Sequence, residues 1–278
     1  MTNEFSQAYD FTGQAMIVTG GAGVLGSVMA EAVLNCGANV AILDLNLQSA
    51  QQAADRLNST SKGGRAIAIQ TNVLQKESIT AAFECVLHEF GRIDLLINGA
   101  GGNKPDASTN PERSFFDLPA EAVRWVFELN LMGTILPCQV IGRHMAEQKR
   151  GVILNISSMN SIRPLTRIPA YSAAKAGVSN FTQWLSTYMA QEYSPAIRVN
   201  ALAPGFFLTD QNRFLLTNAN DGSLSERGKK ILDLTPMGRF GEPKDLIGPM
   251  LWLLSPASAF VTGIVVPVDG GFSAFSGV

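Results

Sequence analysis

Seven short runs of apolar and β-branched residues recur along the chain. They cover residues 15–20, 39–43, 66–73, 94–98, 151–157, 197–203 and 264–268. Each run is predicted to be a strand buried on both faces, because a strand with one solvated face would alternate apolar with polar residues. A sheet built from such strands needs helices on both of its sides.

The segments between the first runs have helical periodicity. Residues 25–37, 47–59 and 77–91 are rich in alanine, and the first and last of these segments end in a glycine that suits a helix C-cap. Alternating strands and helices predict a parallel sheet with right-handed crossovers. We see no internal repeat, low-complexity segment or linker, so the sequence predicts a single α/β domain over residues 1–278.

Composition excludes several classes of protein. The chain has 278 residues, of which 46% are hydrophobic and 16% charged, and it can bury a large core. Its net charge is -2 and no stretch gathers five like charges, so the broad basic surface that binds nucleic acid is absent. Cys36, Cys85 and Cys138 have no paired spacing, which argues against disulfides and structural zinc and predicts small buried hydrophobes.

The start of the chain is polar, and no window approaches the roughly 18 uninterrupted apolar residues of a membrane span. A soluble cytoplasmic protein is therefore predicted. The only histidines, His88 and His144, fall within predicted helices without ligand spacing. We expect them on helix surfaces and expect no metal.

A glycine-rich loop joins the first predicted strand to the first helix. Gly21, Gly23 and Gly26 have the G-x-G-x-x-G spacing, which lets backbone N–H groups approach a pyrophosphate at the positive end of the helix. Asp44 ends the second strand, close to the separation of about 20 residues expected for an acid that binds ribose hydroxyls. These features predict a doubly wound, Rossmann-type fold with a seven-stranded parallel sheet and helices on both faces.

The acid also predicts which cofactor is bound. A carboxylate at position 44 would repel the 2′-phosphate of NADP, and no arginine or lysine stands beside it. NAD(H) is therefore predicted. The alternative is that Asp44 only caps the next helix.

Tyr171 and Lys175 stand four residues apart, so they would share one face of a helix. A free tyrosine has a pKa near 10, and a cation one turn away favours the phenolate and lowers that pKa. Tyr171 would then be a usable acid or base. Ser158 ends a predicted strand thirteen residues earlier and could bind the substrate oxygen that gains or loses the proton.

Seven motifs in order make the chain similar to the short-chain dehydrogenases/reductases over nearly its whole length. They are residues 19–26, 98–101, Asn130, Ser158, residues 171–175, 204–209 and 269–271. The resemblance implies that Ser158 orients a carbonyl or hydroxyl and that Tyr171 is the general acid/base. It implies that Lys175 binds ribose hydroxyls and tunes Tyr171, and that Asn130 holds a water in the proton relay.

The resemblance also implies a cofactor-binding set, with Asn98 and Gly101 on the adenosine side and Thr209 at the nicotinamide carboxamide. The set is Gly20, Gly21, Gly23, Leu25, Gly26, Asp44, Asn72, Val73, Asn98, Ala100, Gly101, Tyr171, Lys175, Pro204, Gly205 and Thr209. It would divide the domain into a cofactor-binding part at about residues 12–150 and catalytic and substrate loops at about 151–278.

Two positions depart from the family pattern. Val24 stands where the glycine pattern has a further glycine, so the loop could be reshaped there, and Asn72 precedes Val73 where an aspartate is usual. An amide can still donate and accept hydrogen bonds.

Each of the four catalytic candidates also has a structural interpretation. Asn130 could mark a mid-helix kink, Ser158 a helix cap, and Tyr171 with Lys175 an amphipathic surface pair.

Two segments interrupt the alternation, at residues 103–118 and 206–240, and both follow predicted strands. Ligands of open α/β sheets bind outside the carboxyl ends of strands, so these segments are suited to cover a substrate. Surface excursions without a role are the alternative.

Polar and basic residues near the motifs are the substrate-binding candidates: Asn103, Lys104, Asn160, Arg163, Gln211 and Arg213. Amides could bind the hydroxyls of a hydroxylated acid and an arginine fork its carboxylate. A small, polar, anionic substrate is predicted. Any one of the basic residues could instead be a solvated surface charge.

Residues 97–109, 157–175, 205–216 and 269–278 look like the D-mannonate oxidoreductases, or fructuronate reductases. This narrower resemblance implies NAD(H)-linked interconversion of D-fructuronate and D-mannonate. Reduction of another sugar, a polyol, a ketogluconate or a 3-oxoacyl substrate stays open, as does a non-catalytic nicotinamide-binding regulatory protein. The family further implies a homotetramer or dimer joined through the helices that carry Asn130 and Tyr171.

Overall fold

The computed structural model describes residues 7–61, 63–208, 216–218 and 222–277, and its centre is one parallel sheet of seven strands. The predicted Rossmann-type fold is confirmed. The strands are β1 (Ala15–Thr19), β2 (Asn39–Asp44), β3 (Ala66–Gln70), β4 (Leu95–Asn98), β5 (Gly151–Ile156), β6 (Ile197–Pro204) and β7 (Val265–Val268), in the spatial order β3-β2-β1-β4-β5-β6-β7.

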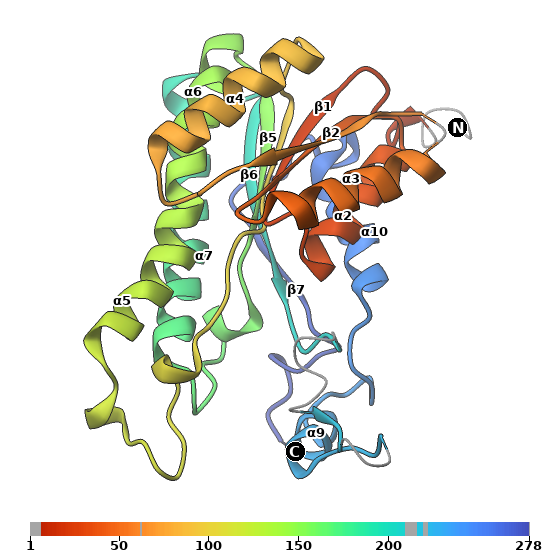
Figure 1. Ribbon diagram of the computed structural model, residues 1–278. Coiled ribbons are helices and arrows are strands. Elements are labelled where there is room, and N and C mark those ends of the chain that lie inside the picture. Colours follow the sequence, from red (N-terminus) through yellow and green to blue (C-terminus); the bar gives the residue numbers. More distant parts are fainter. Residues whose placement is uncertain (1–6, 62, 209–215, 219–221, 278) are drawn as a thin grey trace.

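Helices cover both faces of the sheet (Figure 1). One face packs on α2 (Val24–Asn35), α3 (Leu47–Thr60) and α10 (Ile247–Leu254), and the other packs on α4 (Lys76–Phe90), α6 (Gly133–Gln148) and α7 (Pro169–Glu192). Two further helices, α5 (Ala120–Phe127) and α9 (Glu226–Asp233), belong to the chain that extends beyond the sheet. Alternate strand residues supply the two apolar cores, since neighbouring side chains point to opposite faces.

The order of the strands reverses direction at β1, which pairs with β2 on one side and with β4 on the other. The ends of three strands lie nearly in register there: Thr19 and Asn98, the last residues of β1 and β4, are paired, and Asn98 is paired with Asn155, the residue before the last of β5. Such a switch point leaves a crevice at the carboxyl ends of the strands. Both interrupting segments begin at this edge of the sheet, as expected.

The two edge strands differ from the expectation that every strand is buried on both faces. All residues of β1 and β6 are buried, whereas β3 and β7 are mostly half-buried and each includes an exposed residue. An edge strand has a neighbour on one side only, and apolar composition alone does not reveal that position.

Two smaller expectations are wrong in part. Cys138 is buried and Cys36 half-buried, but Cys85 is exposed on α4. His88 is exposed, whereas His144 is half-buried with its ring edge-on to Phe83, and its Nε2 is buried without a hydrogen-bond partner. The pattern of α6 does not reveal that α4 packs over this histidine.

Within the described residues, no cluster of three or more His, Cys, Asp or Glu side chains could hold a metal ion. In the same part of the chain, no helix combines the length and the apolar character needed to cross a membrane.

A buried arginine binds the carbonyl groups at the C-terminal end of α10. Arg198 of β6 is 6% exposed, and its guanidinium donates to the carbonyls of Leu253 (2.8 Å) and Ser255 (3.0 Å) and to Ser258 Oγ (3.0 Å). The last carbonyls of a helix lack partners within the helix and carry partial negative charge, so a cation there satisfies both needs.

Candidate active site

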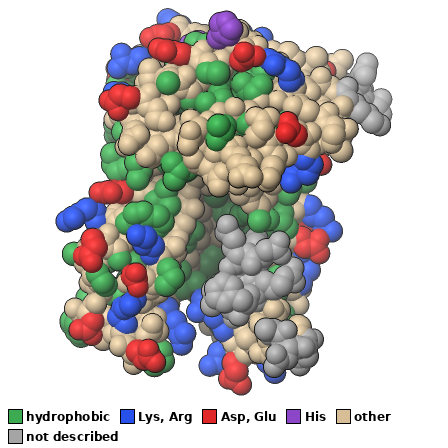
Figure 2. All heavy atoms as spheres, viewed as in Figure 1, with side chains coloured by type: hydrophobic (Ala, Val, Ile, Leu, Met, Phe, Trp, Pro, Cys, Tyr) green, Lys and Arg blue, Asp and Glu red, His purple; other side chains and the backbone are tan. Residues whose placement is uncertain are grey.

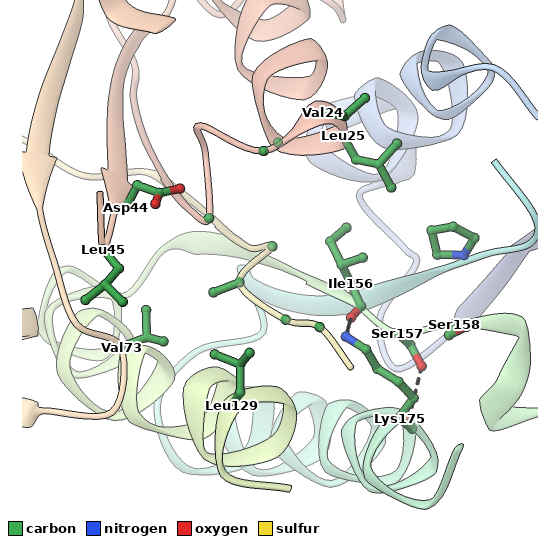
Figure 3. Close-up of a pocket in the computed structure, with 18 of the residues that line it drawn as sticks. Val24, Leu25, Asp44, Leu45, Val73, Leu129, Ile156, Ser157, Ser158 and Lys175 are labelled. Carbon is green, nitrogen blue, oxygen red and sulfur yellow. Dashed lines mark hydrogen bonds between the residues drawn. The ribbon is translucent and has the colours of Figure 1, made fainter. Parts of the chain in front are cut away.

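A cavity of about 720 Å³ lies at the carboxyl ends of the strands (Figure 3). Its wall comes from both halves of the chain, from the glycine-rich loop and Asp44 at one end to Ser158, Tyr171 and Lys175 at the other. In the space-filling view a hollow opens between the two lower lobes of the molecule, with apolar side chains along its wall (Figure 2). The volume is that of a typical small-molecule site.

The glycine-rich loop follows β1 and leads into α2, as predicted. Gly20 has φ +64°, and a Cβ there would lie 2.8 Å from Ala100 Cα, while a Cβ on Gly21 would lie 2.8 Å from Val18 Cγ1. A Cβ on Gly26 would overlap the carbonyl oxygen of Gly20. The loop is therefore packed too closely for side chains, and Gly21 supports it without lining the cavity.

Val24, which departs from the family pattern, begins α2 and lines the cavity. It needs no left-handed backbone, since positive φ values of this loop occur only at Gly20. The turn is therefore kept. No side chain caps this helix end, which leaves its N–H groups facing the cavity side.

Asp44 lines the cavity at the end of β2. Its carboxylate accepts hydrogen bonds from the N–H groups of Ala22 (3.2 Å) and Asn46 (3.1 Å). The N-cap of α3 is Asn46, whose side chain accepts from Ser49 N. The capping interpretation of Asp44 is therefore wrong, and the carboxylate joins β2 to the glycine-rich loop.

Other predicted cofactor residues are divided between cavity and interior. The predicted cofactor residues that line the cavity include Leu25, Asn72, Val73, Ala100, Gly101, Pro204 and Gly205. Asn98 does not line the cavity: it is 1% exposed, and its Nδ2 donates to Asn155 Oδ1 (2.8 Å) and Cys138 Sγ (3.2 Å). The pleat of β4 turns this side chain towards the helices, so the expected direct contact with the adenosine is not supported.

Lys175 lines the cavity and is only 4% exposed, so a surface pair with Tyr171 is excluded. Its Nζ donates to the carbonyl of Ile156 (2.7 Å), a bond drawn in Figure 3, and lies 5.7 Å from the centre of the Tyr171 ring. Burial lowers the pKa of Lys175 to about 8. An ammonium fixed in this way presents its remaining donors to the cavity.

Tyr171 shares the α7 face with Lys175, but the effect on its pKa differs from the expectation. Burial raises the pKa of the phenol, and a hydrogen bond with Ser158 partly lowers it. Burial is the larger of the two effects, because a phenolate that is removed from water loses its hydration. The phenol is therefore protonated at neutral pH and can donate a proton.

Ser158 follows β5 and is 7% exposed. It is the N-cap of a short 3₁₀ helix, Met159–Ser161, and its Oγ accepts from Asn160 N (3.2 Å). The capping interpretation is thus correct, and it is compatible with a functional role because the same hydroxyl interacts with Tyr171. The cap fixes the direction of the hydroxyl.

Asn130 lies in a π-helical turn, Glu128–Met132, between α5 and α6. The side chain is fully buried and bridges to the loop after β4: Nδ2 donates to the carbonyl of Gly102 (2.7 Å), and Oδ1 accepts from Gly102 N (3.2 Å). A Cβ on Gly101 would lie 2.8 Å from Asn130 Oδ1 and 3.2 Å from Lys175 Nζ. The irregular turn therefore brings Asn130 and Lys175 to the same glycine.

A chain of serine hydroxyls beside the site was not predicted. Ser157 Oγ donates to the carbonyl of Lys175 (3.1 Å) and lies 2.7 Å from Ser179 Oγ, which donates to Ser161 Oγ (2.9 Å). These bonds join β5 and the Ser158 turn to α7.

The cavity wall also contains Trp125, Leu129, Phe206 and Phe207, none of which was predicted. In residues 120–132 apolar residues recur with helical spacing, which could have indicated a packed helix face. The spacing does not indicate that part of this face lines a cavity.

The substrate candidates are dispersed. The ammonium of Lys104 lies 4.6 Å from the ring centre of Trp125, which lines the cavity, while Asn103 Nδ2 donates to Ser108 Oγ. Asn160 is 6% exposed and does not line the cavity, and Arg163 donates to the carbonyl of Phe275 (2.9 Å). Thr209, Gln211 and Arg213 lie outside the described residues.

Comparison with known proteins places this arrangement in a family. Residues 14–220 match the short chain dehydrogenase family. Over its whole length the chain is 46% identical to an uncharacterised oxidoreductase of Haemophilus influenzae, and 99% of that protein is covered. The chain belongs to the short-chain dehydrogenase family.

Two further relatives bear on the chemistry of this dehydrogenase. A solved structure from Haemophilus influenza with bound NAD, provisionally named a D-mannonate oxidoreductase, has a TM-score of 0.91 and 45% identity over 99% of this chain and all of that one. The 5-keto-D-gluconate 5-reductase of Escherichia coli is 32% identical over 95% of this chain and 96% of its own. The dehydrogenase is an oxidoreductase acting on alcohol and ketone groups.

Proposed function

We propose that this short-chain dehydrogenase uses NAD(H) to interconvert a sugar-acid ketone and its alcohol, with D-fructuronate and D-mannonate as the pair. The observation that carries the proposal is the single cavity that joins Asp44 at one end to Ser158, Tyr171 and Lys175 at the other. A dinucleotide bound along it would have its ribose near the acid and its nicotinamide near the proton donor.

The residues present fit NAD(H). Gly20, Gly21 and Gly26 allow the close packing of the loop, and no side chain caps the start of α2, so its N–H groups are free to bind a pyrophosphate. Asp44 accepts two backbone hydrogen bonds and lines the cavity, where an acidic side chain disfavours a 2′-phosphate. The cofactor supplies or accepts the hydride.

The chain's own residues manage the proton and the substrate oxygen. Tyr171 donates a proton to the carbonyl oxygen during reduction and accepts it during oxidation, and Ser158 orients that oxygen by a hydrogen bond. Lys175, fixed by Ile156, binds ribose hydroxyls. Asn130 holds a water that carries the proton onward, and Thr209 contacts the carboxamide of the nicotinamide.

An acidic sugar is favoured over a neutral or acyl substrate for two reasons. Over nearly its whole length the chain is 45% identical to the protein provisionally named a D-mannonate oxidoreductase, compared with 32% to the 5-keto-D-gluconate 5-reductase. Basic side chains also stand in the segments beside the catalytic residues, among them Lys104 and Arg163. A non-catalytic regulatory role is disfavoured because Ser158, Tyr171 and Lys175 are all present and close together.

We also propose that the protein is cytoplasmic and that it forms a homotetramer or a dimer. Trp184 and Tyr188 of α7 are 57% and 39% exposed, and their rings stack on each other with centroids 5.0 Å apart. A solvent-facing aromatic stack on a helix is suited to pack against a second copy. Sedimentation of the purified protein gives its mass directly.

A substrate panel tests the proposal. We expect NADH to be oxidised with D-fructuronate at a kcat/KM at least about tenfold above that with tagaturonate, 5-ketogluconate, fructose or acetoacetyl thioester, which corresponds to about 1.4 kcal/mol of transition-state binding. We expect NADPH to be a poorer donor. Preferred turnover of a neutral sugar or the thioester would leave the family assignment intact and overturn the sugar-acid proposal.

A further inference from the structure

The chain after β7 folds into a tight turn, residues 269–275. Asp269 holds this turn together, since its carboxylate accepts hydrogen bonds from Gly271 N (2.9 Å) and Ser273 N (2.9 Å). The N–H of Phe275 donates to the carbonyl of Gly271 (3.1 Å). Gly271 has φ +89°, a value that favours glycine. The turn therefore has internal hydrogen bonds that maintain its shape.

One side of this turn packs against the wall of the cavity. Gly205 lines the cavity, and a Cβ there would lie 2.6 Å from Asp269 Cα, which is too close for any side chain. The ring of Phe272 meets the ring of Phe206 edge-on, with centroids 5.1 Å apart and planes at 69°. Phe206 also lines the cavity. The turn thus supports two neighbouring residues of the wall.

Phe206 depends on this support because it has space on two sides. Besides the main cavity it lines a smaller one of about 170 Å³, whose wall includes Met237, Arg239 and Asp269. A side chain between two cavities lacks packed neighbours there, so it changes rotamer more easily than a fully packed one. The edge-to-face contact with Phe272 opposes such a change. The shape of this part of the cavity therefore depends on the turn.

The far end of the turn is bound by Arg163. Its Nη1 donates to the carbonyl of Phe275 (2.9 Å). Arg163 stands two residues after the 3₁₀ helix that Ser158 caps, and its own N–H donates to the carbonyl of Met159 (2.9 Å). A charged donor forms a stronger hydrogen bond than a neutral one. The guanidinium therefore joins the turn to the segment that begins at Ser158.

We propose that Arg163 is a positioning residue that shapes the substrate end of the cavity through the turn of residues 269–275. The inference rests on the proposed role of Ser158 at the substrate oxygen, but not on which ketone is reduced. Arg163 fixes the end of the turn, the turn holds Phe272, and Phe272 keeps Phe206 in place in the wall. Arg163 then affects substrate binding without touching the substrate.

The kinetics of variants test the effect on the substrate. We expect Arg163→Met and Phe272→Ala each to raise KM for D-fructuronate about three- to tenfold, with a smaller change in kcat, because each loosens the turn without removing a catalytic group. Phe272→Tyr keeps the ring and should have the KM of the wild type. The double variant should be no worse than the poorer single variant, since both substitutions act through one turn. Multiplied effects would contradict this shared route.

A measurement without substrate separates this role from direct contact with the substrate. Hydrogen–deuterium exchange, followed by mass spectrometry, reports on the hydrogen-bonded N–H groups of Gly271, Ser273 and Phe275. We expect the peptide that contains them to exchange at least about threefold faster in Arg163→Met than in the wild type.

Arg167→Met is the matched control for the exchange measurement. Arg167 is an exposed arginine of the same segment, and within the part of the chain that the structure describes its side chain has no hydrogen bond or ion pair. The substitution removes the same charge as Arg163→Met. The turn in this variant should exchange at the rate of the wild type.

The outcomes separate this proposal from the proposed function. Faster exchange in Arg163→Met together with a raised KM supports the positioning role. Unchanged exchange overturns it, and a raised KM would then show that Arg163 contacts the substrate directly. Faster exchange with an unchanged KM also overturns it, because the turn would not shape the cavity. If D-fructuronate is not reduced, the proposed function fails, and the same comparison with the ketone of the substrate panel that is reduced decides the role of Arg163.

Discussion

Replacing Tyr171 with phenylalanine is expected to lower kcat by about 10²- to 10⁴-fold, the usual contribution of a general acid or base. The change removes only the phenol oxygen, and the ring keeps its place against the small apolar cluster of Ala107, Ala122, Val126 and Ala170. The Kd for NADH, measured by the quenching of protein fluorescence, should therefore stay nearly constant. Steady-state NADH oxidation gives kcat.

The pH dependence provides a control for the same assignment. Burial raises the pKa of Tyr171, so the protonated phenol that reduction needs is present at neutral pH, whereas the phenolate that oxidation needs forms as pH rises. The rate of alcohol oxidation should increase from neutral to alkaline pH in the wild type only. A Tyr171→Phe enzyme with wild-type kcat would show that the proton comes from another group.

Replacing Arg198 with methionine is expected to lower the free energy of unfolding by about 3–5 kcal/mol. Methionine cannot donate to the carbonyls of Leu253 and Ser255, which would then be buried without partners at the end of α10. Arg198 does not line the cavity that contains Tyr171, so the kcat of the folded protein should change little. Urea unfolding followed by circular dichroism measures the loss.

The matched control for this variant is Arg65→Met. Arg65 forms an ion pair with Glu89 on the surface, with 53% of its side chain exposed, and such pairs contribute about 0–1 kcal/mol. If the Arg198 and Arg65 variants lose the same small amount, the guanidinium of Arg198 is not a significant stabiliser of the end of α10.

Much of the fold could be predicted because its signals are local. Apolar strand runs, helical periodicity and the glycine spacing each depend on residues close in sequence, and all seven strands were found. The burial of the edge strands β3 and β7 could not be predicted, since the order of strands is set by contacts between distant segments.

The catalytic candidates Ser158, Tyr171 and Lys175 could be predicted for a different reason. Tyr171 and Lys175 share a helix face, so their spacing alone brings them together, and Ser158 stands at the end of a strand. The direction of the Tyr171 pKa shift was not predictable from spacing. It depends on how deeply the phenol is buried and on its hydrogen bond with Ser158, and both follow from the packing of α7 beside β5 and the Ser158 turn.

Predictions failed most at side chains whose partners are far away in sequence. Asn98 was expected at the cofactor, but the β4 pleat turns it towards Asn155. Arg163, a substrate candidate, has a partner that the sequence did not indicate, the carbonyl of Phe275.

The most direct test of the central claim follows the hydride itself. The wild-type enzyme would be given NADH that carries deuterium at both positions of C4 of the nicotinamide, together with D-fructuronate, and the product would be analysed by mass spectrometry and NMR. The account predicts D-mannonate with one deuterium on the carbon that carries the new hydroxyl. Unchanged D-fructuronate, with no NADH consumed by an enzyme that binds it, would contradict the account.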